Sequence, residues 1–322
     1  MESKYKFSED YKELCDLMAP ILANYQNQAI FQFILQAIVT EGNRVWNENE
    51  SDERFKVTKL EIPSADQTMI PVQVMEKQGE HRTDSPCLIY YHGGGWIFPF
   101  MVSHLRLVRE YIERTCCKVV CVNYRLVPDF PFPKGLEDCY STLLWTHENA
   151  QSLGIDPTRI VVGGDSAGGH YSAVVSLMAR DKNGPAIAGQ MMTYPATDAR
   201  MDTESMKLFT DTPMWNAPMT ELVYKLYLAN GDFGMRPYFS PIEAESLKNL
   251  PRAYIEVADI DCLRDEGIEY AEALKAAGVD VQLHKTIETI HGFDYLTNPN
   301  KTIEESFMLR TAFLNSIWRD CQ

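Results

Sequence analysis

From residue 55 onward, hydrophobic positions form short runs that alternate with stretches of helical periodicity, such as residues 166–180 and 265–277. The eight runs are FKVTKLEI, MIPVQVMEK, CLIYY, VVCVNY, IVVGG, GQMMTY, AYIEVA and VDVQLHKTI. We interpret the first two as an antiparallel pair of strands. The later runs are almost continuously apolar, as is typical of parallel strands that are covered on both faces. The pattern therefore predicts an α/β protein with an eight-stranded, mostly parallel sheet flanked by helices.

The first 50 residues show helical spacing in place of this alternation. Their apolar positions include Tyr11, Leu14, Cys15, Met18 and Leu22. Residues 24–40 carry no charge, and their polar side chains fall four apart on one stripe, at Gln28, Gln32, Gln36 and Thr40. This segment is too short and too interrupted to span a membrane. It is interpreted as a helix buried under other helices, as a lid over an apolar pocket, or as an interaction or lipid-surface element.

Residues 197–240 break the rhythm a second time, with a helical insertion rich in methionine and aromatic residues. The insertion is longer than connections between elements usually are, which suggests a function of its own. We interpret it as a second cap segment beside the N-terminal helices. The predicted organisation is a first part of the cap at 1–50, a first part of the core at 51–196, the cap insertion at 197–240 and the rest of the core at 241–322.

Composition and charge exclude some classes of partner. The chain has 322 residues, of which 45% are hydrophobic, so it can bury a sizeable core. Its formal net charge is -15, and it has no run rich in lysine and arginine. These features argue against binding to nucleic acid or to an anionic membrane surface.

The cysteines and the N-terminal segment point to a compartment. The spacing of the 8 cysteines matches neither a disulfide scaffold nor a CxxC pair. Cys87 and Cys121 lie in apolar runs, where a reduced cysteine packs as a small hydrophobe. The segment MESKYKFSEDYKEL is charged and lacks the apolar core of a signal peptide. A cytoplasmic protein without stable membrane insertion is therefore expected.

A candidate nucleophile lies at the junction of the fifth run and the helix that follows it. Gly164-Asp-Ser-Ala-Gly168 fits the G-x-S-x-G pattern, in which a serine occupies a tight turn from strand to helix. Side chains on the neighbouring glycines would crowd that turn. Because the run IVVGG precedes the motif and a helical stretch follows it, Ser166 is a candidate nucleophile rather than part of an ordinary turn.

A serine hydroxyl needs a base, which in this architecture follows the serine along the chain. Of the histidines after Ser166, His170 lies on the next helix and faces away, and His284 lies within a strand pattern. His291 follows that strand, in a loop at the carboxyl end of the sheet where ligands bind in open α/β sheets. We therefore predict that His291 is the base.

The acid that orients the base should end the preceding strand. The segment AYIEVADIDCLRDEG offers five acidic residues. Glu256 lies inside the strand, and Asp265 and Glu266 resemble the acids that the dipole favours in the first turn of a helix. Asp259 and Asp261 remain, and spacing alone does not separate them.

Acyl transfer also requires donors for the oxyanion that forms. The third strand runs into His92-Gly-Gly-Gly-Trp96, where three successive glycines leave backbone N–H groups uncovered. This HGGG arrangement lies where an oxyanion loop belongs, and the N–H of Ala167 would be the second donor.

Together these motifs resemble the hormone-sensitive-lipase-like branch of the α/β-hydrolases, the bacterial family IV carboxylesterases. The matching pieces are HGGGW (92–96), NYRLVPDFPFPKGLEDCY (123–140), GGDSAGG (163–169), DCLRDEG (261–267) and HGF (291–293). The resemblance implies an α/β-hydrolase core, with a cap built from the N-terminus and the 197–240 insertion. A homodimer would be usual for this branch.

The resemblance also assigns the site. It implies Ser166 as nucleophile and His291 as base. The family's D-P-L-x-D-E motif aligns on Asp261, so Asp261 is the implied acid and Asp259 the fallback. The backbone N–H groups of Gly93, Gly94 and Ala167 are the implied oxyanion hole. Departures from the family include Cys262 in place of a proline, Asp129-Phe130 in place of Glu-His, and Pro99 in place of a glycine.

The predicted function is a serine carboxylesterase that acts on a small-molecule ester with a short or medium acyl chain. No metal and no other cofactor are expected, because HExxH, P-loop and GxGxxG patterns are absent from the sequence. The candidates for an apolar substrate pocket are Trp96, Phe98, Phe100, Tyr194, Met214 and Trp215. The alternatives are an amide hydrolase or deacylase with the same triad, and a non-catalytic small-molecule receptor. His291 argues against the receptor, since such receptors are expected to lose the base.

Overall fold

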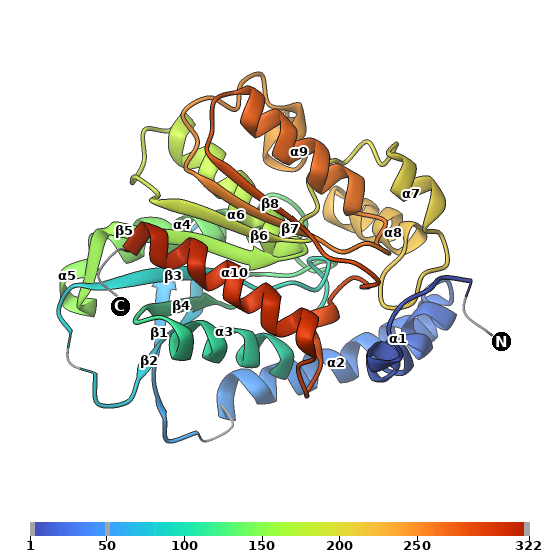
Figure 1. The fold of residues 1–322 in the computed structure, drawn as a ribbon, viewed down its shortest axis with the longest axis horizontal. Helices are drawn as coiled ribbons and strands as arrows, with labels where there is room; N and C mark the ends of the chain where they lie inside the picture. Colours follow the sequence, from blue (N-terminus) through green and yellow to red (C-terminus); the bar gives the residue numbers. More distant parts are fainter. Residues whose placement is uncertain (1–3, 49–51, 81, 319–322) are drawn as a thin grey trace.

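The computed structural model describes residues 4–48, 52–80 and 82–318 (Figure 1). The strands are β1 (Phe55–Pro63), β2 (Met69–Lys77), β3 (Ser85–Tyr91), β4 (Lys118–Val122), β5 (Ile155–Asp165), β6 (Gly189–Thr193), β7 (Ala253–Val257) and β8 (Val281–Lys285). The helices are α1 (Lys12–Asn24), α2 (Gln28–Glu48), α3 (Val102–Arg114), α4 (Lys134–Glu148), α5 (Ala150–Leu153), α6 (Ala167–Asp181), α7 (Glu204–Leu208), α8 (Ala217–Tyr227), α9 (Arg264–Ala276) and α10 (Lys301–Trp318). Short 3₁₀ turns are η1 (Glu9–Tyr11), η2 (Arg236–Tyr238), η3 (Pro241–Glu243) and η4 (Phe293–Tyr295).

The strands form one eight-stranded sheet in the order β1-β2-β4-β3-β5-β6-β7-β8. β2 pairs antiparallel with both β1 and β4, and the remaining pairs are parallel. The eight apolar runs therefore correspond to the eight strands, and the predicted α/β fold with a mostly parallel sheet is confirmed.

Helices cover both faces of the sheet, which explains the nearly continuous hydrophobicity of its central strands. α3 and α10 lie on the near face in Figure 1 and contact each other, and α6 and α4 lie behind the sheet. α9 packs with α6 in a shared apolar cluster, so it belongs to the same face as α6. All seven residues of β3 are buried as a result.

Of the helices in the two segments that interrupt the alternation, α1, α7 and α8 lie on the right in Figure 1, and α2 runs along the bottom of the view toward α1. Residues of α8 line a cavity that also contains Ser166, the residue that directly follows β5. α8 therefore lies over the carboxyl end of β5. Lys4 and Asp211 form an ion pair that joins the N-terminal segment to the 197–240 insertion.

The interpretation of residues 24–40 as one helix buried under others is wrong. The chain turns at residues 25–27, and α2 begins at Gln28 and continues to Glu48. Most of the α2 surface is in water, and the side chain of Phe33 is 77% exposed. The lack of charged residues in 24–40 therefore belongs to an exposed helix surface and is not a sign of burial. In the part of the chain that the structure describes, no helix has both the length and the apolar character needed to cross a bilayer.

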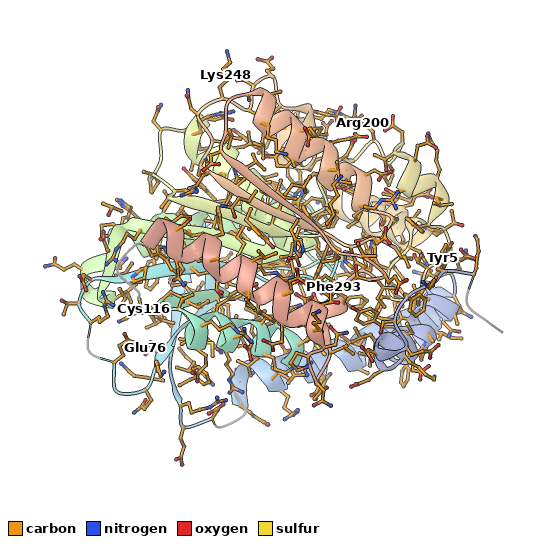
Figure 2. The ribbon with its side chains drawn as sticks, in the orientation of Figure 1. Tyr5, Glu76, Cys116, Arg200, Lys248 and Phe293 are labelled. Carbon is orange, nitrogen blue, oxygen red and sulfur yellow. The ribbon has the colours of Figure 1, made fainter. Side chains whose placement is uncertain are left out.

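The cysteines within the sheet behave as small hydrophobes. Cys87 and Cys121 are buried free thiols, as the apolar runs predicted. Cys116, labelled in Figure 2 at the edge of the molecule away from α1, is instead disulfide-bonded. The cysteine spacing did not predict that bond.

Candidate active site

The turn between β5 and α6 places Ser166 in a strained backbone conformation, with φ 54° and ψ -116°. A positive φ is unfavourable for a residue with a side chain, and persists only where the surrounding structure enforces it. A side chain at Gly164 or Gly168 would collide with the carbonyl oxygen of Tyr91, so this turn packs against β3 only with glycine on both sides. The G-x-S-x-G pattern is therefore a steric requirement of the turn.

The structure brings Ser166, His291 and Asp261 together in one hydrogen-bonded line. The His291 Nε2 atom lies 2.9 Å from Ser166 Oγ, and His291 Nδ1 lies 2.6 Å from Asp261 Oδ2. Asp261 Oδ1 also accepts a hydrogen bond from the backbone N–H of Leu263 at 3.0 Å. All three side chains are buried. The ionised carboxylate accepts from Nδ1–H, which leaves Nε2 free to accept the serine proton.

The other residues weighed for these roles lie elsewhere. Asp259 is 44% exposed and faces Arg264, with its Oδ1 atom 3.8 Å from the guanidinium. His170 is buried on α6 and contacts the carbonyl oxygen of Ala196 through Nδ1, at 3.0 Å. His284 lies on β8, with its Nδ1 2.9 Å from Glu256 Oε2. Of the two candidate aspartates, the structure therefore places Asp261, and not Asp259, against His291.

The loop after β3 carries the glycines predicted as oxyanion donors. His92 Nδ1 lies 2.7 Å from the carbonyl oxygen of Gly93, and the hydroxyl of Tyr124 donates to the His92 carbonyl at 2.8 Å. The N–H of Gly94 points opposite to the Gly93 carbonyl because the peptide is planar and trans. Gly94 has φ 109°, which favours glycine. His92 thus fixes the direction of the Gly94 N–H, and the assignment of Gly93, Gly94 and Ala167 as donors stays a prediction.

A cavity beside Ser166 has a volume of only about 10 Å³, roughly the space of one water molecule. Its lining comprises Gly95, Trp96, Ser166, Ala167, Ala196, Trp215, Thr220, Val223 and Leu263. Trp96 stacks on Tyr227 with ring centroids 4.5 Å apart, and the Trp215 indole N–H donates to Thr220 Oγ1 at 2.9 Å. Two of the predicted pocket residues, Trp96 and Trp215, therefore close this cavity.

The remaining pocket candidates do not line that cavity, and their role in binding substrate stays a prediction. The ring of Tyr194 packs against the His291 imidazole, with centroids 4.7 Å apart. Phe100 packs edge-on against Trp46. Phe98 and Met214 are buried and lie near Gly94 and Gly292.

Four residues of the cavity wall were not identified from the sequence. Ala196 follows β6, Thr220 and Val223 lie on α8, and Leu263 precedes α9. They share only the property of lying near the carboxyl ends of strands or on the insertion. For Thr220 and Val223, their place in the 197–240 insertion was the available sign of a role at the site.

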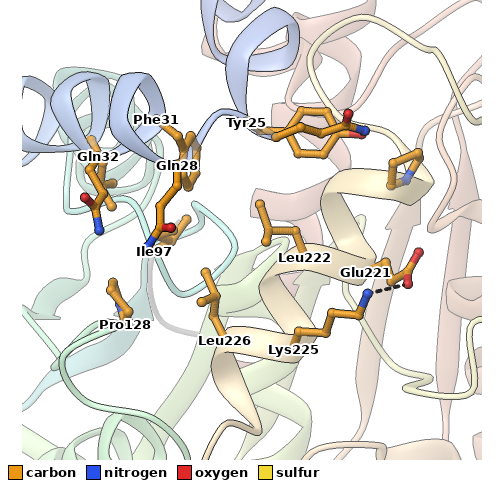
Figure 3. A pocket seen from close by; sticks show the side chains of 13 residues that line it. Tyr25, Gln28, Phe31, Gln32, Ile97, Pro128, Glu221, Leu222, Lys225 and Leu226 are labelled. Carbon is orange, nitrogen blue, oxygen red and sulfur yellow. Dashed lines mark hydrogen bonds and ion pairs between the residues drawn. The ribbon is translucent and has the colours of Figure 1, made fainter.

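A larger groove of about 610 Å³ lies between α2 and α8 (Figure 3). Gln28 and Gln32 of the polar stripe line it together with apolar residues such as Phe31, Leu222 and Leu226. The groove also contacts Ile97, the residue after Trp96. α2 therefore contributes to an apolar groove that reaches the loop after β3, at Ile97.

A buried ion network supports the loop that carries His291. Arg310 of α10 has no exposed surface and binds the carboxylates of Glu256 and Asp294, the latter at 2.6 Å. The Tyr194 hydroxyl donates to the other oxygen of Asp294 at 2.5 Å. Burial raises the pKa of Glu256. The Arg310 cation and the hydrogen bonds donated to this carboxylate outweigh that effect and lower the pKa from 4.5 to about 2. Phe293, labelled in Figure 2, is fully buried beside this network.

Replacing Arg310 with methionine is expected to lower the free energy of unfolding by about 3–5 kcal/mol, because two buried carboxylates lose their cation. Urea unfolding followed by circular dichroism measures this change. Ionised Glu256, whose pKa is lower in the folded state, stabilises the wild type fully above pH 4.5. That contribution is lost as the pH falls toward 2, and the variant should lack it.

Arg44→Met is the matched control, because Arg44 lies on the surface of α2 and is 47% exposed beside Glu41 and Glu48. No measurable loss of stability is expected there. An equal loss in both variants, or none in Arg310→Met, would contradict a structural role of the buried pair.

Over residues 4–48, 52–80 and 82–318, no group of three or more histidine, cysteine, aspartate or glutamate side chains is arranged to hold a metal ion.

Comparison with known proteins agrees with this fold. A family model described as the alpha/beta hydrolase fold matches residues 88–295. Carboxylesterase NlhH of Mycobacterium tuberculosis is 39% identical over 215 residues, which are 66% of this chain and 67% of that protein. An arylesterase of Saccharolobus solfataricus is 33% identical over 243 residues, which are 74% of this chain and 77% of that protein. An esterase structure from Rhizomucor miehei has a TM-score of 0.85 and 29% identity, and the match covers 98% of each chain.

Proposed function

Because this chain belongs to the hormone-sensitive-lipase-like branch of the alpha/beta hydrolases and is a carboxylic ester hydrolase, we propose that it cleaves short- to medium-chain acyl esters through Ser166, His291 and Asp261. The observation that carries this proposal is the unbroken line of hydrogen bonds from Ser166 Oγ through the imidazole to Asp261. A serine, a base and an orienting acid in this arrangement are the requirements for nucleophilic acyl transfer.

In the proposed acylation step, Ser166 Oγ attacks the ester carbonyl carbon while its proton passes to His291 Nε2. Asp261 accepts the hydrogen bond from Nδ1–H and stabilises the imidazolium. The backbone N–H groups of Gly93, Gly94 and Ala167 donate to the oxyanion of the tetrahedral intermediate. The C–O bond to the alcohol then breaks, and the imidazolium returns its proton to the leaving oxygen. The products of this step are the free alcohol and a serine ester.

In the proposed deacylation step, His291 takes a proton from water, and the hydroxide attacks the carbonyl of the serine ester. The second tetrahedral intermediate collapses with cleavage of the bond to Ser166 Oγ. The proton on His291 passes to Oγ, which regenerates the serine and releases the carboxylic acid.

The preference for shorter acyl chains is supported by the small cavity beside Ser166. Trp96 stacks on Tyr227, the last residue of α8, so this part of the wall is packed against α8. Trp215 and residues of α8 also line the cavity, and they must move to admit any acyl group. A small acyl group needs the least displacement, and overfilling a packed cavity costs free energy.

A series of p-nitrophenyl esters from acetate to laurate tests this preference. We expect kcat/KM to be highest between acetate and hexanoate and to fall by about tenfold or more at laurate, because the longer chain displaces more of α8. The release of p-nitrophenolate at a fixed pH measures each rate. The corresponding p-nitroanilides provide a matched set in which only the scissile bond changes.

Three outcomes oppose the proposal in different ways. Faster cleavage of laurate than of acetate or butyrate would overturn the chain-length preference. Anilides cleaved as fast as esters would favour an amide hydrolase with the same triad. Inertness toward the whole series would overturn the esterase assignment for these substrates.

A further inference from the structure

Three loops of the candidate site meet at one pair of side chains, Asp165 and Tyr295. Asp165 directly precedes Ser166 at the end of β5, and Tyr295 follows His291 by four residues, in η4. The Tyr295 hydroxyl donates a hydrogen bond to Asp165 Oδ2. A side chain at Gly93 would collide with that same oxygen and would place its Cβ atom 2.7 Å from Tyr295 Oη. The oxyanion loop therefore lies directly against the bonded pair.

The pair is the end of a chain of hydrogen bonds that all run in one direction. The backbone N–H of Met101 donates to His104 Nδ1 at 2.9 Å, so the proton of this imidazole lies on Nε2. His104 Nε2 is 3.2 Å from Tyr295 Oη, to which it donates. Tyr295 Oη can then use its own proton only toward Asp165. Each donor and acceptor in the chain thus has a single consistent role.

The ionisation states agree with this direction. Burial lowers the pKa of His104 to about 3, so its imidazole is neutral. Burial and the nearby carboxylate raise the pKa of Tyr295 well above 10, which keeps its hydroxyl protonated as a donor. Burial raises the pKa of Asp165, and the Tyr295 and Tyr90 hydroxyls oppose that shift by stabilising the ionised form.

We infer that Tyr295 is a positioning residue for the reaction, because its bond to Asp165 holds the loop of His291 against the turn of Ser166 and beneath Gly93. This inference rests on the proposed function. Tyr295 touches neither substrate nor the reacting atoms. It sets the relative position of the base, the nucleophile and the oxyanion loop.

Geometry explains why this bond matters beside the other supports. The hydrogen bond from the Ser166 hydroxyl to His291 Nε2 must break and reform as the proton moves, so it cannot also fix the distance between the two loops. The Tyr295–Asp165 bond joins the same two loops and takes no part in the proton transfer. The Arg310–Asp294 pair ties the His291 loop to α10, and the Tyr194 hydroxyl ties Asp294 to the residue after β6, whereas the Tyr295–Asp165 bond reaches the turn of Ser166 itself.

The test is Tyr295→Phe, which removes one hydroxyl and keeps the ring. We expect kcat for p-nitrophenyl butyrate to fall by about tenfold to a hundredfold, with KM changed by less than about twofold. The rate constant with which a p-nitrophenyl phosphonate phosphonylates Ser166 should fall by a similar factor. The amount of p-nitrophenolate released per chain should stay at one equivalent.

Tyr90→Phe is the matched control, since the Tyr90 hydroxyl donates to the other oxygen of the same carboxylate without touching the His291 loop. It should lower kcat by less than about threefold. Equal losses in both variants would overturn the inference, because the carboxylate alone would then matter. A second result would also overturn the inference. If only a fraction of the Tyr295→Phe chains reacted with the phosphonate, and that fraction had normal kcat, the loss of activity would come from misfolding.

If the wild type cleaved esters and the Tyr295→Phe variant had the same kcat, this inference alone would be overturned. A wild-type protein inert toward both the esters and the phosphonate would overturn the proposed function instead.

Discussion

Ser166→Ala is expected to lower kcat for p-nitrophenyl butyrate by about a millionfold, to the limit of detection. The alanine has no Oγ to attack the carbonyl, and no acyl-enzyme can form. His291 keeps its bond to Asp261, but its Nε2 atom no longer has the Ser166 hydroxyl to activate. Initial rates with active-site-titrated wild type as the reference measure the loss.

Ser176→Ala is the matched control for that experiment. Ser176 is a buried serine on α6, the helix that follows Ser166, and its hydroxyl donates to the helix carbonyl of Ser172 at 2.7 Å. Its loss should leave kcat and KM within about twofold of the wild type. If Ser166→Ala retained more than a small fraction of wild-type activity, the serine would not be the nucleophile.

The fold was predictable because the central strands, such as β3 and β4, are nearly continuous apolar runs, and burial on both faces produces that pattern directly. Ser166 and His291 were predictable for a topological reason. Both residues follow parallel strands, β5 and β8, and the carboxyl ends of parallel strands lie at the same edge of a sheet. Long separation along the chain therefore did not conceal their proximity.

The choice between Asp259 and Asp261 could not be made from spacing, since both lie just beyond β7. The structure resolves it through the turn after β7, where Ile260 pairs with Ile290 and the Leu263 N–H binds Asp261. These contacts bring together segments whose relative position the local sequence does not encode.

Part of the cavity lining and the exposure of α2 were not predicted, for related reasons. Hydrophobic character says that Tyr194 and Phe98 are buried, but not which surface they bury. In α2, the lack of charge was compatible with burial, yet Phe33 faces water. The Asp165–Tyr295 pair was hidden too, because its partners are 130 positions apart and neither belongs to a polar cluster in the sequence.

Asp261→Asn is expected to lower kcat by about 10⁴-fold through the tautomer of His291. Asp261 Oδ1 accepts from the Leu263 N–H, so the amide oxygen of an asparagine should occupy that position and its NH₂ should face His291 Nδ1. Nδ1 would then have to accept, which moves the imidazole proton to Nε2. A protonated Nε2 cannot take the proton of Ser166. Steady-state rates on p-nitrophenyl butyrate measure the loss, with circular dichroism to confirm folding.

Asp259→Asn makes the same chemical change two residues away and separates the two candidate acids. Asp259 is 44% exposed and faces Arg264, so its conversion should change kcat by less than about twofold. The ratio of the two effects is informative because charge, size and local sequence are matched. If Asp259→Asn caused the larger loss, the line from Ser166 to Asp261 would not be the catalytic one. If both variants remained active, the imidazole would be oriented without any carboxylate, and Tyr194 and Trp215, which pack on the His291 ring, would be the side chains left to hold it.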